Sequence, residues 1–66
     1  MGRLLAIDIL KENEKYTIRE MWTDGVSGHK YEERKVKYSA AEAERYGLRT
    51  AIYLKVKFLG ITEATA

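Results

Sequence analysis

The chain has no cysteine and no proline, and its single histidine is His29. The lack of cysteine excludes disulfides, thiolate zinc sites, iron–sulfur clusters and thiol nucleophiles. One histidine cannot supply a His-rich site, so we expect no metal and no cofactor. The absence of cysteine also fits the reducing cytoplasm, where we expect the protein to be located.

Long apolar runs are also absent. The first ten residues contain one arginine, and Asp8 interrupts their apolar run too early for the core of a signal peptide. No segment approaches the ~20 apolar residues that a transmembrane helix needs. We therefore expect no association with a membrane.

Familiar catalytic patterns are missing too. Ser27 and His29 are two residues apart, which makes no catalytic triad, and residues 25–30 lack the spacing of a phosphate-binding loop. Glu32 and Glu33 are adjacent on an expected strand, so they point to opposite faces and cannot share a proton. A chain of this size has little room for a pocket of ~300 Å³ or more. We expect a protein that is not an enzyme.

The length of 66 residues predicts one domain, covering residues 1–62, with a frayed tail over residues 63–66. A domain of this size buries only ~60% of its unfolded surface and is marginally stable. Disulfides are excluded and no metal is expected, so we expect a homodimer or a larger homo-oligomer. A well-packed monomer is the alternative.

Three segments are typical of strands. Residues 3–11 are apolar on both faces, which indicates a central strand. Residues 15–23 are rich in Tyr, Thr, Ile and Trp, but Glu20 shares a face with apolar residues. Either a bulge shifts the register there, or Glu20 is buried with a partner. Residues 30–38 carry charges typical of an edge strand.

A helix and a last strand follow. Ser39 and Glu42 form a capping box, and Gly47 suits the residue that follows a helix, which predicts a helix of about two turns. The period of two returns over residues 50–62 and predicts a long last strand. The expected fold is therefore α+β: a small, mostly antiparallel sheet with the order β-β-β-α-β and one short helix packed on one face.

Alternation in the last strand separates two faces. Ile52, Leu54, Val56 and Phe58 would lie in the core. The opposite sheet face would be basic and aromatic, and its binding residues would be Arg19, Lys35, Lys37, Tyr53, Lys55 and Lys57. The loop before the third strand would add contacts from Ser27, His29 and Lys30.

Such a face suggests binding rather than catalysis. Lysines attract phosphates, and aromatic rings offer stacking platforms to unpaired bases. We therefore expect a small non-enzymatic module that contacts nucleic acid or a nucleoprotein complex. Ordinary solvated surface is one alternative for these lysines. Others are a viral or phage accessory protein that acts as an inhibitor or adaptor of a host protein complex, and a structural subunit of an assembly.

Overall fold

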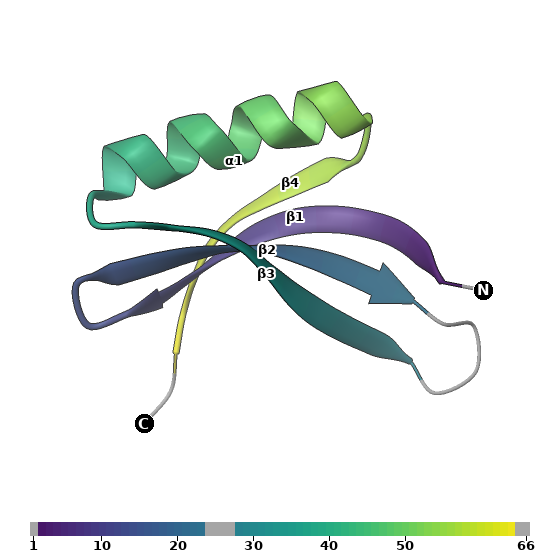
Figure 1. The fold of residues 1–66 in the computed structure, drawn as a ribbon, viewed down its shortest axis with the longest axis horizontal. Helices are drawn as coiled ribbons and strands as arrows, with labels where there is room; N and C mark the ends of the chain where they lie inside the picture. Colours follow the sequence, from purple (N-terminus) through teal and green to yellow (C-terminus); the bar gives the residue numbers. More distant parts are fainter. Residues whose placement is uncertain (1, 24–27, 65–66) are drawn as a thin grey trace.

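The computed structural model describes residues 2–23 and 28–64 as one sheet and one helix (Figure 1). The elements are β1 (Arg3–Glu12), β2 (Lys15–Thr23), β3 (His29–Lys37), α1 (Ala40–Leu54) and β4 (Lys57–Glu63). The strand order is β3-β2-β1-β4, in which β1, β2 and β3 are antiparallel neighbours and β4 runs parallel to β1. Helix α1 lies across one face. The predicted α+β fold is confirmed.

The core lies between α1 and the two central strands. Ile7 and Ile9 of β1 and Ile18 of β2 are fully buried, and they pack with Ala43 and Ala51 of α1. The small side chains on this side of the helix let its backbone approach the sheet. Because β1 pairs with β2 on one side and β4 on the other, the prediction of a central strand for the first segment is right.

Helix α1 is about twice as long as predicted. It begins after Ser39, whose hydroxyl accepts a hydrogen bond from the Glu42 amide at 3.5 Å, and it continues through Gly47 to Leu54. A Cβ at Gly47 would lie 2.7 Å from Cε1 of Phe58. Gly47 is therefore a close-packing position within the helix, and the prediction that it ends the helix is wrong.

The topology explains the extra length. The chain leaves β3 at one end of the sheet and must return to the other end before β4 can run parallel to β1. The 15 residues of α1 span about 22 Å at 1.5 Å per residue. The seven residues of β4 span about 23 Å. A two-turn helix would cover only half of that distance.

The predicted last strand is wrong over its first half. Residues 50–54 are helical, and Lys55 ends the helix in the left-handed conformation with φ 60°. The Lys55 amide donates to the carbonyls of Ala51 and Ile52. Ile52 is exposed on the helix instead of lying in the core, and Tyr53 belongs to α1 instead of the sheet.

The second half of the predicted last strand is β4, and it contains a β-bulge. Phe58 lies opposite Ile7 and Ile61 lies opposite Ile9, so two residues of β4 stand against one residue of β1. Gly60 permits this bulge because its φ is +82°. Phe58 and Ile61, although three residues apart, both pack on the core beneath α1.

The strand β4 ends one residue beyond the expected boundary at 62. Glu63 forms an ion pair with Lys11 at 3.5 Å, and the Ala64 amide donates to the Lys11 carbonyl at 2.8 Å. Among residues 2–23 and 28–64, no helix is long and apolar enough to cross a membrane. The same residues contain no group of three or more His, Asp or Glu side chains that could hold a metal.

Candidate functional site

A bulge in β3 rearranges the basic residues that the sequence placed on one sheet face. Glu33 lies opposite Arg19, but the next paired residue, Lys35, lies opposite Ile18. Arg34 is therefore an extra residue in β3. Because Ile18 faces α1, the bulge turns Lys35 toward the helix side of the sheet, and the prediction that Lys35 shares a face with Arg19 is wrong.

The same bulge places Arg34 and Lys37 on one side of β3, although regular alternation would separate them. The Arg34 guanidinium forms an ion pair with Glu20 at 2.5 Å, and the Trp22 indole donates to the same carboxylate at 3.2 Å. The sequence left two alternatives for Glu20, a bulge or burial with a partner. The structure shows the second, because Glu20 is partly buried and paired with Arg34. The ammonium of Lys37 lies 5.1 Å from the centre of the Tyr46 ring.

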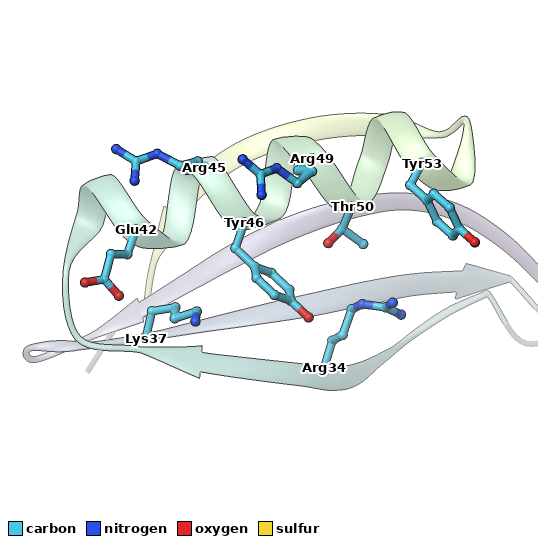
Figure 2. A pocket seen from close by; sticks show the side chains of 8 residues that line it. All are labelled: Arg34, Lys37, Glu42, Arg45, Tyr46, Arg49, Thr50 and Tyr53. Carbon is cyan, nitrogen blue, oxygen red and sulfur yellow. The ribbon is translucent and has the colours of Figure 1, made fainter.

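A groove of about 550 Å³ lies between α1 and β3, and we call it the α1–β3 groove (Figure 2). Its lining residues are Arg34, Lys37, Glu42, Arg45, Tyr46, Arg49, Thr50 and Tyr53. Four of these side chains are cationic, one is acidic and two are tyrosines. The groove is larger than we expected for a chain of this length.

Three of the four cations form no ion pair among the described residues. Lys37, Arg45 and Arg49 form no ion pair within 4.0 Å among residues 2–23 and 28–64. Arg45 and Arg49 are four residues apart on α1, a spacing at which like charges destabilise a helix by about 0.2–0.5 kcal/mol. The lining of the groove therefore has four cationic side chains and one carboxylate, and of the four cations only Arg34 is in an ion pair among the described residues.

Two tyrosines give the groove an aromatic wall. Tyr46 extends from the middle of α1 toward β3, between Lys37 and Arg34, and Tyr53 lies at the end of the groove near the C-terminus of the helix (Figure 2). The Tyr53 side of the groove is open to solvent, because this residue is 82% exposed. An exposed ring held on a helix can stack against a planar ligand.

Arg19 lies on the sheet face away from α1, as predicted, but its guanidinium is paired with the carboxylate of Asp8. Its guanidinium donates to both carboxylate oxygens of Asp8, from Nε to Oδ1 at 2.9 Å and from Nη2 to Oδ2 at 2.6 Å. The guanidinium carbon also lies 3.9 Å from the centre of the Tyr31 ring. Both side chains of the ion pair are largely buried, so Arg19 is not free to hold a phosphate.

The residues of the predicted binding site therefore lie on different parts of the molecule. Lys37 and Tyr53 both line the α1–β3 groove, at its opposite ends (Figure 2). Lys35 is exposed but does not line the groove, Lys55 ends α1, and Lys57 begins β4 at the far edge of the sheet. A single basic sheet face built from these residues does not exist.

The expected loop contacts lie elsewhere as well. His29 and Lys30 are the first residues of β3 rather than loop residues, and Lys30 forms an ion pair with Glu32 at 3.6 Å. Ser27 lies outside the described residues.

Four residues that line the groove are absent from the predicted site, namely Arg34, Arg45, Tyr46 and Arg49. The signal for the helix residues is their spacing, because Tyr46, Arg49 and Tyr53 recur at the i, i+3 and i+7 positions of one helix face. Ending the helix at Gly47 concealed that pattern.

Comparisons of the chain with protein-family models, with curated proteins and with solved structures found no match.

Proposed function

We propose that the protein is a binding module that holds a single-stranded nucleic acid in the α1–β3 groove. The observation that carries this proposal is the combination of three cations without an acidic partner and two tyrosines in one groove. Phosphates are bound by basic side chains, and bases stack on aromatic rings.

The basic and the aromatic residues of the groove have separate tasks. Arg45 and Arg49 of α1 and Lys37 of β3 are the phosphate contacts. Tyr53 offers its exposed ring to a base. Tyr46 lies against Lys37, which holds the ammonium near the groove.

The rings favour a single strand over a duplex. A base can stack on Tyr53 only when it is unpaired, and single-stranded binding sites typically combine a basic groove with aromatic platforms. Among the described residues, Glu42 is the one carboxylate that lines the groove, and one carboxylate makes no acid–base pair of the kind that glycosidases or aspartic proteases use. We therefore assign the groove to binding.

The test is a fluorescence anisotropy titration of labelled single-stranded oligonucleotides at two salt concentrations. With three phosphate contacts on a single strand, the slope of log K against log salt should be about −2. In the Arg45→Gln/Arg49→Gln variant the affinity should fall at least about tenfold, and the slope should weaken by about 1.4 because two contacts are lost. Glutamine keeps the helix propensity of arginine.

The matched control is Arg3→Gln/Lys15→Gln. This pair removes the same charge from two exposed positions outside the groove, so its affinity should stay within about twofold of the parent and its slope should not change. Absence of binding at low salt contradicts the proposal, and so does an equal loss of affinity in both variants.

An acidic protein surface is the alternative occupant of the groove, because it also presents anions. A poly-glutamate competitor and the Tyr53→Ala variant separate the two. For a nucleic acid, Tyr53→Ala should weaken binding by about 1–3 kcal/mol for the lost stacking, and poly-glutamate should compete poorly. Strong competition with no effect of Tyr53→Ala would favour the acidic protein.

A further inference from the structure

The sheet face away from α1, which we call the open face, is buried in part although no element of the described chain covers it. Ala6, Asp8 and Thr17 on the central strands are at most 4% exposed. Around them lie apolar side chains that are half-buried or about half exposed, namely Leu10, Met21, Tyr31, Val36 and Leu59. The face is therefore apolar around a polar centre.

This composition departs from that of a sheet face that meets water. In a half-solvated antiparallel sheet, the outward residues are polar along each strand. In the middle of the open face the charged residues of β1 and β2 are Asp8 and Arg19, and these two neutralise each other. Glu12 and Lys15, which share this face by register, lie at the strand ends. Sheets bury an apolar face against a further layer.

We infer that this further layer is the open face of a second copy of the chain. The face carries opposite charges at its two sides, with Glu33 on edge strand β3 and Lys57 on edge strand β4. These residues cannot pair within one chain, because β1 and β2 lie between them and three strand spacings amount to about 14 Å.

A twofold axis parallel to the strands makes this charge distribution self-complementary. Such an axis places β3 of one copy over β4 of the other, so Glu33 of each copy faces the strand that carries Lys57 of its neighbour. Lys57 is level with Ala6, Met21 and Tyr31, which is two residues from the level of Glu33. Two residues correspond to about 7 Å along a strand, which long side chains can bridge.

The open face is narrow. It is about 14 Å wide from β3 to β4, and its longest strand, β1 with 10 residues, is about 33 Å long. This area of about 500 Å² is below the ~800 Å² per partner of a standard interface, so we expect a weak dimer. The α1–β3 groove lies on the opposite side of the sheet, so a dimer formed in this way leaves both grooves open. The inference is therefore independent of the proposed function.

The test is sedimentation velocity of the full chain over a range of concentrations. The parent should form a dimer, and Met21→Gln/Leu59→Gln, which places two amides in the interface, should raise its dissociation constant at least about tenfold. The matched control, Leu48→Gln/Ile52→Gln, removes two apolar side chains from the exposed side of α1 and should leave the dimer unchanged. Circular dichroism checks that each variant folds.

A charge exchange identifies the face directly. Glu33→Lys and Lys57→Glu should each weaken the dimer about three- to tenfold, and the double variant should recover the parent dissociation constant because the pairs re-form with opposite sign. A monomeric parent at every concentration overturns the inference. It is also overturned if Met21→Gln/Leu59→Gln leaves the dimer intact, or if the double charge exchange fails to restore it.

Discussion

Gly47 is the residue at which helix propensity and packing conflict. Glycine in the middle of a helix costs about 1 kcal/mol relative to alanine. Glycine is nevertheless favoured here because a Cβ would have no space. It would lie 2.7 Å from Cε1 of Phe58 and 3.4 Å from Cδ1 of Ile9. The contact joins α1 to β4 and β1, so this glycine sets how closely the helix approaches the sheet.

Replacing Gly47 by alanine should therefore destabilise the protein despite the gain in helix propensity. Overpacking of a core costs about 1–3 kcal/mol, so the net loss should be about 1–2 kcal/mol, measured as the free energy of unfolding in urea. In a Phe58→Leu background the smaller side chain relieves the clash. The same Gly47→Ala change should there be neutral or stabilising. A stabilising effect in the parent background would show that the ring moves aside freely.

The helix-to-strand junction is the element that the sequence predicts least well. Residues 52–58 alternate between apolar side chains and Tyr or Lys, and Ile, Tyr and Val favour strands, so the local pattern favours an extended chain. A helical pattern is present in the same segment, because Ala43, Gly47, Ala51 and Leu54 recur at helical spacing. The topology decides between them, since the chain must return along the sheet before β4.

The first three strand segments and the order of elements could be predicted, because the strands have apolar or alternating patterns separated by turn residues. The three register shifts among the described residues could not be predicted from alternation. One is between Leu4 and Ala6 of β1, one is at Arg34 and one is at Gly60. A single extra residue reverses the face of every residue that follows, so the bulge in β3 moved Lys35 and Lys37 to the helix side. The groove depends on that shift.

The end of α1 gives a prediction at the scale of the element. Lys55 adopts φ 60° and ψ 44°, a conformation that costs about 1 kcal/mol in a residue with a Cβ and nothing in glycine. Lys55→Gly should therefore raise the free energy of unfolding by about 0.5–1 kcal/mol, measured in urea. Lys55→Val should lower it by more than that, because a β-branched residue is strained there. An unchanged stability in both variants would contradict a left-handed helix end.

At the scale of the whole molecule, the groove and the open face lie on opposite sides of one sheet. The proposed dimer therefore presents two outward grooves, and a strand long enough to reach both binds the second groove at a high effective concentration. Occupation of the two grooves by one strand is a property that neither surface has alone.

The comparison that reveals this property uses two oligonucleotides, one of about 8 nucleotides, which fills one site, and one of about 40, which can reach both. We compare the affinity for the long oligonucleotide divided by the affinity for the short one. This ratio should be at least about tenfold higher for the parent dimer than for Met21→Gln/Leu59→Gln, while both proteins bind the short oligonucleotide equally. The two proteins have the same net charge, so electrostatics alone cannot produce a difference between them. Equal ratios would show that the two grooves act separately.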